Sequence, residues 1–138
     1  MVNWTHNGKE MLSHGDFTSD TVGFIYRIIY DDNREYIGKK LIRSNRKLKP
    51  TKKQLAIRKN YKRVERIDLK FTDYEGSSKN TVGLIISKKE IIELSSDKVN
   101  LSYMETKWLM RHDVLCDDKY LNDCIGGTYY SGKIHKGL

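Results

Sequence analysis

The chain has 138 residues, the length of one domain with its own hydrophobic core. It carries 26 Lys and Arg against 18 Asp and Glu and has a pI near 9.4, so we expect a polyanion as partner, and nucleic acid is the commonest. No apolar run approaches the roughly 18 residues that a membrane span needs, and the N-terminus lacks a signal-sequence pattern. We therefore expect a cytoplasmic protein without a membrane segment.

The first 21 residues differ in composition from the rest of the chain. Residues 1–21 are polar, with isolated apolar side chains at Trp4, Met11 and Phe17. This composition predicts an extended N-terminal arm laid over a domain formed by residues 22–138.

A hairpin is predicted next. Residues 22–30 form a run rich in apolar and β-branched side chains, and residues 35–41 follow it after a short polar stretch. Asp31, Asp32 and Asn33 in that stretch tolerate the backbone geometry of a tight hairpin turn. Two antiparallel strands are therefore expected.

The chain then becomes strongly basic. From residue 39 to residue 66, 13 of 28 residues are Lys or Arg and only Glu65 is acidic. Pro50 followed by Thr51 predicts a helix start, with a helix over 52–63. Too few of its residues are apolar to bury a broad face, so we expect a solvated helix or a mobile loop.

The remaining elements complete an α/β pattern. After a turn at 74–78 we expect a short helix over 81–86, then a third strand over 89–94. The last long helix is predicted to begin at Ser102, because Glu105 three residues later gives a capping-box pattern. This order predicts a small α/β domain with a central, mainly antiparallel three-stranded sheet flanked by helices.

Four short segments suggest a family. The second tyrosine of the predicted hairpin lies ten residues after the first and is followed by Lys39. The segments are Gly23-Phe24-Ile25-Tyr26, Tyr36-Ile37-Gly38, Tyr74-Glu75-Gly76-Ser77-Ser78 and Tyr103-Met104-Glu105. With them the chain resembles the GIY-YIG nuclease superfamily, and within it small phage proteins of the Seg type, which are homing-endonuclease-like. The resemblance spans nearly the whole chain and implies a GIY-YIG fold and a metal-dependent DNA endonuclease of phage origin, acting in the cytoplasm of the infected bacterium.

The same resemblance implies the roles of individual residues. Tyr26 would be the general base, and Tyr36 with Lys39 would orient water and phosphate. Glu105 would hold one Mg²⁺ or Mn²⁺, with Asn122 supporting the site. A family arginine falls on Arg46, for which Arg43 or a lysine of the basic stretch is an alternative.

These roles agree with what phosphodiester hydrolysis needs, namely a base, a cation near the phosphate and a metal held by a carboxylate. A phenol titrates near 10, so Tyr26 can act as base only where positive charge lowers its pKa. Simpler interpretations stay open: the two tyrosines can pack in a core, and Glu105 can cap its helix.

Double-stranded DNA is the expected partner. The chain has no room for an appended recognition module, so recognition must come from the basic segment, the N-terminal arm or a homodimer. Contacts to the DNA backbone are expected from basic side chains at Lys40, Arg43, Lys47, Lys49, Lys52, Lys53, Arg58, Lys59, Lys62 and Arg63. Alternatives to the endonuclease are a catalytically inactive DNA-binding protein on the same scaffold and a structure-selective repair nuclease.

Overall fold

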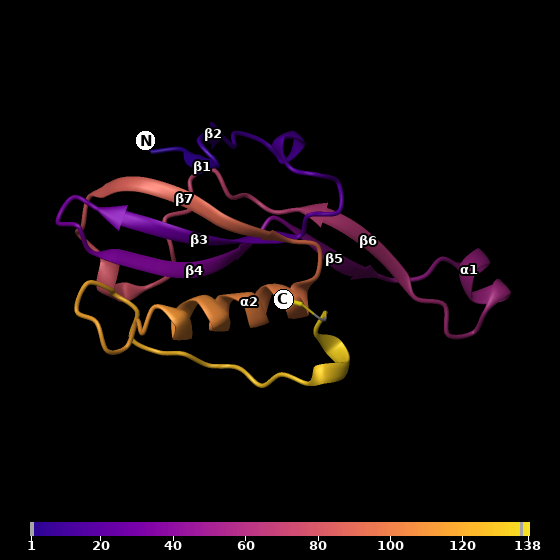
Figure 1. The fold of residues 1–138 in the computed structure, drawn as a ribbon. Helices are drawn as coiled ribbons and strands as arrows, with labels where there is room; N and C mark the ends of the chain where they lie inside the picture. The colour runs from indigo at the N-terminus through magenta and orange to yellow at the C-terminus, as the bar shows by residue number, and fades with distance from the viewer. Residues whose placement is uncertain (1, 136) are drawn as a thin grey trace.

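The structure is a computed structural model that describes residues 2–135 and 137–138. Figure 1 shows a sheet with one long helix, α2, on one side, and a ribbon of two strands that leads away from it. The elements are β1 (Trp4–His6), β2 (Lys9–Glu10), β3 (Gly23–Tyr30), β4 (Glu35–Leu41), β5 (Arg43–Leu48), α1 (Lys52–Ile57), β6 (Arg63–Asp68), β7 (Ile86–Ser95) and α2 (Lys98–Arg111). Short 3-10 turns lie at His14–Asp16, Lys79–Thr81 and Ser131–Lys133.

The central sheet has five strands in the order β2-β1-β7-β3-β4. The α/β class is confirmed, but the predicted three-stranded, mainly antiparallel sheet is wrong. β3, β4 and β7 form an antiparallel centre, and β1 adds a parallel pairing to β7, which makes the sheet mixed. Residues 4–10, expected as part of an arm, supply two of the strands, which are too short to show a strand period in the sequence.

The predicted hairpin is confirmed and fixes the positions of the two motif tyrosines. Tyr26 pairs with Gly38 across β3 and β4, and Ile28 pairs with Tyr36. The turn includes Asn33 at a φ of 67°, a conformation that asparagine tolerates. Because side chains alternate along a strand, Tyr26, Tyr36 and Gly38 share one face of the sheet.

Each face of the sheet has its own hydrophobic core. On the tyrosine face, Trp4, Phe24 and Tyr26 pack together, and Trp4 is completely buried. On the other face, α2 covers Ile25 and Ile37, and Trp108 of α2 packs against this second cluster. β3 therefore buries residues on both sides, which is why its sequence is apolar almost throughout, whereas the edge strand β4 is partly exposed and carries Glu35, Lys39 and Lys40.

Helix α2 begins earlier than predicted. Asp97 is the N-cap, and its carboxylate accepts hydrogen bonds from the N–H groups of Val99 and Asn100. The predicted cap at Ser102 is wrong, since Ser102 lies within the helix. Glu105 lies in its middle, so it has no capping role to fill, and the alternative explanation for this glutamate is removed.

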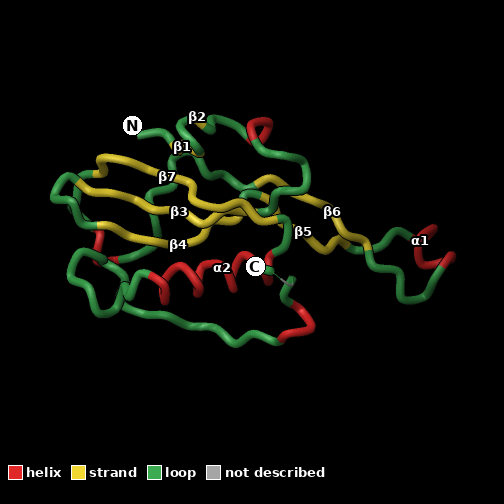
Figure 2. Tube along the Cα trace, viewed as in Figure 1, coloured by secondary structure: helices red, strands yellow, loops and turns green. Residues whose placement is uncertain are grey.

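The basic segment folds as a second, two-stranded sheet of β5 and β6. The predicted helix over 52–63 is wrong in extent: α1 covers six residues at the tip, and β6 begins at Arg63. The predicted helix over 81–86 is also wrong, because the 3-10 turn ends at Thr81 and β7 begins at Ile86. Figure 2 shows the ribbon's strands and its short terminal helix projecting beyond the main sheet. Among the residues that the structure describes, no helix is long and apolar enough to cross a membrane.

Candidate active site

The phenol of Tyr26 lies across Gly38. Tyr26 is 1% exposed, and a Cβ placed on Gly38 would lie 2.5 Å from its hydroxyl oxygen. No side chain larger than hydrogen fits between these residues. Because β4 is the edge strand of the sheet, the hydroxyl is directed over the glycine toward that edge. Gly38 of the Tyr36-Ile37-Gly38 motif is therefore required by Tyr26 of the other hairpin motif.

Two further tyrosines surround Tyr26. The ring centroid of Tyr36 lies 6.2 Å from that of Tyr26, and the ring centroid of Tyr74 lies 5.8 Å from it. Gly76, at a φ of +90°, brings the loop against both hairpin tyrosines. The sequence singled out this loop through its motif alone and assigned Tyr74 no role.

The loop that carries Tyr74 is held by buried donors. The indole N–H of Trp4 donates to the Phe71 carbonyl at 2.8 Å, and the buried ammonium of Lys89 donates to the Thr72 carbonyl at 3.1 Å. The ammonium of Lys40 lies 4.6 Å from the centroid of the Tyr74 ring. The placement of Tyr74 thus depends on β1, β4 and β7 together.

Glu105 reaches the same edge of the sheet from α2. Burial raises the pKa of its carboxyl, while the charge and the backbone N–H of Lys39 on the edge strand act in the opposite direction. Burial is the largest cause of the raised pKa of both Tyr26 and Tyr36, and the negative charge of Glu105 acts in the same direction. The carboxylate and the two phenols are therefore close enough to interact electrostatically.

The donor set at this edge suits a hard cation that keeps most of its water. Within residues 2–135 and 137–138, no group of three or more His, Cys, Asp or Glu side chains could hold a metal. Mg²⁺ is commonly bound through one or two carboxylates with water and substrate phosphate completing its shell. The partly desolvated, raised-pKa carboxylate of Glu105 fits such a single protein ligand.

Burial keeps the phenols protonated in the protein alone. Desolvation is the largest cause of the raised pKa of both Tyr26 and Tyr36, and for Tyr26 the shift is very large. Lys39 does not counter this effect, because its position on β4 places its ammonium on the α2 side of the sheet, where it donates to the Ser102 hydroxyl. Lys40, on the tyrosine face, is the lysine that contacts the aromatic cluster.

Asn122 lies beside the edge strand. Its side-chain amide accepts a hydrogen bond from the Ile37 N–H and donates one to the Ile37 carbonyl. Glu35, two residues earlier, pairs its backbone with Lys119 and Leu121. The edge of β4 is thus bonded along much of its length by the segment after α2.

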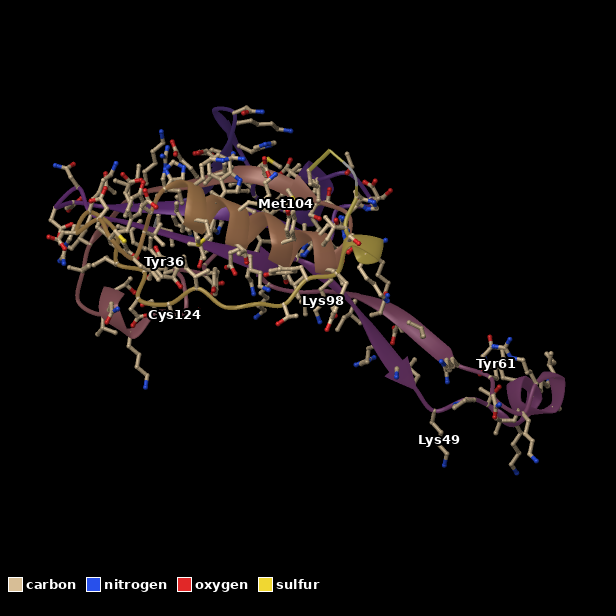
Figure 3. All side chains as sticks on the ribbon, turned by 60° about the horizontal axis from the view of Figure 1, so that its bottom comes forward. Tyr36, Lys49, Tyr61, Lys98, Met104 and Cys124 are labelled. Carbon is tan, nitrogen blue, oxygen red and sulfur yellow. The ribbon has the colours of Figure 1, made fainter. Side chains whose placement is uncertain are left out.

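The structure does not bring the predicted arginine to the tyrosines. Arg46 lies on β5 in the ribbon and donates to the Glu65 carboxylate at 2.7 Å. Its alternative, Arg43, uses its guanidinium to bond the carbonyls of His14, Thr18 and Thr21. Figure 3 shows Tyr36 and Lys49 far apart, with Lys49 out on the ribbon. Apart from Lys40, the predicted DNA-contacting residues lie on the ribbon and its tip, namely Arg43, Lys47, Lys49, Lys52, Lys53, Arg58, Lys59, Lys62 and Arg63.

Comparison with known proteins agrees with this arrangement. Residues 4–131 match the model of a family described as "Putative endonuclease segE, GIY-YIG domain". A comparison with curated proteins and one with solved structures found no match. The family match includes both motif strands, the Tyr74 loop and all of α2. The chain belongs to the SegE family of GIY-YIG endonuclease domains.

Proposed function

We propose that this protein is a metal-dependent DNA endonuclease that hydrolyses phosphodiester bonds, with Mg²⁺ or Mn²⁺ held by Glu105. One observation carries the proposal: Tyr26 and Tyr36 pack together at Gly38 of β4, with ring centroids 6.2 Å apart, and the partly buried carboxylate of Glu105 lies near Lys39 of the same strand. A cation bound there would neutralise charge on the phosphoryl oxygens and favour an ionised phenol.

The two hairpin tyrosines have different surroundings, which supports different roles. Tyr26 is almost fully buried beneath Gly38 and Tyr74, whereas Tyr36 is half-buried. Burial is the largest cause of the raised pKa of both phenols, and for Tyr26 the shift is very large. We assign the removal of the proton from water to Tyr36, and a positioning hydrogen bond to Tyr26. This exchanges the roles expected from the sequence.

The resemblance to small Seg-type phage proteins supports a phage origin and action in the cytoplasm of the infected bacterium. Double-stranded DNA is the proposed substrate, because the charge of the chain is strongly positive and the family is one of endonucleases. A homodimer would offer a second copy of the site for cleavage of both strands.

The experiment that tests the function is cleavage of supercoiled plasmid with Mg²⁺, with Mn²⁺ and with EDTA. We expect nicked or linear product with either metal and none with EDTA. Glu105→Gln protein, purified in the same way, controls for a contaminating nuclease and should give no product. Binding without cleavage in every metal would favour the inactive DNA-binding protein, and cleavage confined to branched or flapped DNA would favour the repair nuclease.

A further inference from the structure

The charge of the protein is concentrated on the ribbon. Residues 43–68 contain 11 Lys and Arg and two acidic residues. The whole chain contains 26 and 18, which leaves 15 basic and 16 acidic residues for the other 112 positions. The body that contains the active site is therefore nearly neutral, and the attraction to a polyanion comes from the projecting β5–β6 ribbon.

The two faces of the ribbon differ in chemistry. The strand register places Arg46 opposite Glu65 and Leu48 opposite Arg63 on one face, which we call the paired face. Arg46 donates to the Glu65 carboxylate, and Arg63 donates to the Lys49 carbonyl. The charge of Arg46 is thus compensated by a carboxylate, whereas Arg63 is held by a backbone carbonyl and keeps its charge.

The opposite face, which we call the basic face, is formed by Arg43 opposite Asp68, Asn45 opposite Arg66 and Lys47 opposite Val64. Arg43 and Asp68 form an ion pair at the root, and the four residues beyond them are exposed. In the part of the chain that the structure describes, neither Lys47 nor Arg66 has a carboxylate partner within 4.0 Å. Their charges are therefore available to an external anion.

The root of the ribbon is tied to the body. The His14 ring nitrogen Nε2 lies 3.0 Å from the Ile42 carbonyl, just before β5, and 2.9 Å from the Leu69 carbonyl, just after β6, so it contacts both strands at the root. Arg43 adds three hydrogen bonds to carbonyls of residues 14–21. A two-stranded ribbon alone is marginally stable, so these bonds fix the direction in which this one projects.

The basic face leads toward the active site. At its root, Asn45 and Arg66 line a cavity of about 530 Å³ together with Lys98, the first residue of α2. The carboxylates of Asp20 and Asp97 line the same cavity, so the duplex would pass along its Arg66 and Lys98 side and not through it. Lys98, Ser102 and Glu105 follow at i, i+4 and i+7, a spacing that places them on one side of a helix. The hydroxyl of Ser102 holds the ammonium of Lys39. Figure 3 shows Lys98 between Tyr36 and the ribbon.

We propose that the basic face, through Lys47 and Arg66, binds the phosphate backbone of the duplex whose scissile phosphate lies at Glu105. The duplex would follow the line from the ribbon past Lys98 and Lys39 to the edge of β4. This inference rests on the proposed function for the position of the cleaved bond. Contacts of this kind give affinity and salt dependence without sequence recognition.

The test compares two matched double variants. Lys47→Gln with Arg66→Gln removes two charges from the basic face, and Arg46→Gln with Arg63→Gln removes two from the paired face of the same ribbon. The affinity for a labelled duplex is measured by fluorescence anisotropy in EDTA at several salt concentrations. Circular dichroism confirms that both variants fold.

For the basic-face variant we expect the log-log salt slope to fall by about two units, since each phosphate contact contributes about 0.9 on duplex DNA. The paired-face variant should lose at most about one unit, because Arg46 is paired with Glu65 and only Arg63 is without a carboxylate partner. Equal losses in both variants, or a larger loss in the paired-face variant, would overturn the assignment, as would a wild-type protein that does not bind DNA. This experiment measures binding and not cleavage. If binding follows the prediction but the protein has no nuclease activity, the proposed function is refuted and the role of the basic face stands.

Discussion

Asn122 takes the place of a neighbouring strand for Ile37: its amide oxygen lies 3.1 Å from the Ile37 N, and its amide nitrogen lies 2.7 Å from the Ile37 carbonyl oxygen. Ile37 is 1% exposed, so a loss of these bonds would leave buried backbone groups unpaired. We expect Asn122→Ala to lower the free energy of unfolding by about 1–3 kcal/mol per unpaired group, measured by urea denaturation.

Asn122→Asp is the matched variant, because it keeps the acceptor for the Ile37 N–H and replaces the donor with a carboxylate oxygen that faces the Ile37 carbonyl. These two oxygens repel each other, so at pH 7 it should be no more stable than Asn122→Ala. If instead Asn122→Ala unfolds like the wild type but cleaves DNA slowly, the asparagine acts on the substrate, as the sequence resemblance implied.

A second prediction concerns the pH dependence of stability. Burial places the pKa of Glu105 above its usual value of 4.5, so the folded protein holds this proton more tightly than the unfolded chain does. The free energy of unfolding contributed by Glu105 should therefore fall as the pH rises from 4.5 through the pKa of the folded state. Glu105→Gln should remove this loss and make the metal-free protein more stable at pH 7.

The measurement is thermal unfolding of metal-free protein between pH 4 and pH 8, with the exposed Glu10→Gln as the control. The same Glu105→Gln protein should lose at least about a hundredfold in cleavage rate, because a bound metal contributes several kcal/mol to stabilising the transition state. A Glu105→Gln protein that is less stable than the wild type at pH 7 would show that burial is not the main influence on this carboxyl.

The third prediction separates the two hairpin tyrosines. Tyr36→Phe should lower the single-turnover cleavage rate by about 10² to 10⁴, the usual contribution of a general base. Tyr26→Phe, which removes a hydroxyl above Gly38, should have a smaller effect on the rate and leave DNA binding intact. The rates are compared at saturating Mg²⁺, and a larger loss in Tyr26→Phe would return the role of base to that residue.

The fourth prediction tests the close approach of Gly38 to Tyr26. A Cβ on Gly38 would lie within 2.9 Å of three atoms of the Tyr26 side chain, so Gly38→Ala must displace the phenol. Overpacking of this kind costs about 1–3 kcal/mol, and we expect both the midpoint of urea unfolding and the cleavage rate to fall. Gly126→Ala is the control, since a Cβ there meets no atom within 4 Å; equal effects of the two variants would contradict the steric argument.

The sequence predicted the hairpin well because β3 is buried on both faces and a polar turn separates it from β4. The apolar and β-branched residues of β3 are needed by two cores at once, and this leaves a strong local signal. The glycine of the second motif was identified by resemblance, and its physical reason, the phenol of Tyr26, appears only in the register of the two strands.

The ribbon could not be predicted in the same way. β5 and β6 project from the body and cover no core, so no apolar alternation marks either strand. The two strands are paired through cross-strand partners such as Arg46 and Glu65. These residues are 19 positions apart, so no local sequence pattern indicates that they pair. The proximity of Tyr74 to Tyr26 likewise depends on Trp4 and Lys89, both distant in sequence from Tyr74.

The two tryptophans lie on opposite sides of the sheet, which gives the protein two separate fluorescent reporters. Trp4 is buried beside the tyrosines and beneath the ammonium of Lys89, 4.6 Å from its ring. Trp108 stacks on the His112 imidazole, with the ring centroids 5.3 Å apart. Trp4→Phe protein would therefore report on the packing of α2, and Trp108→Phe protein on the aromatic side that holds the Tyr74 loop. Emission from the second variant during DNA binding would follow the active-site side without any added label.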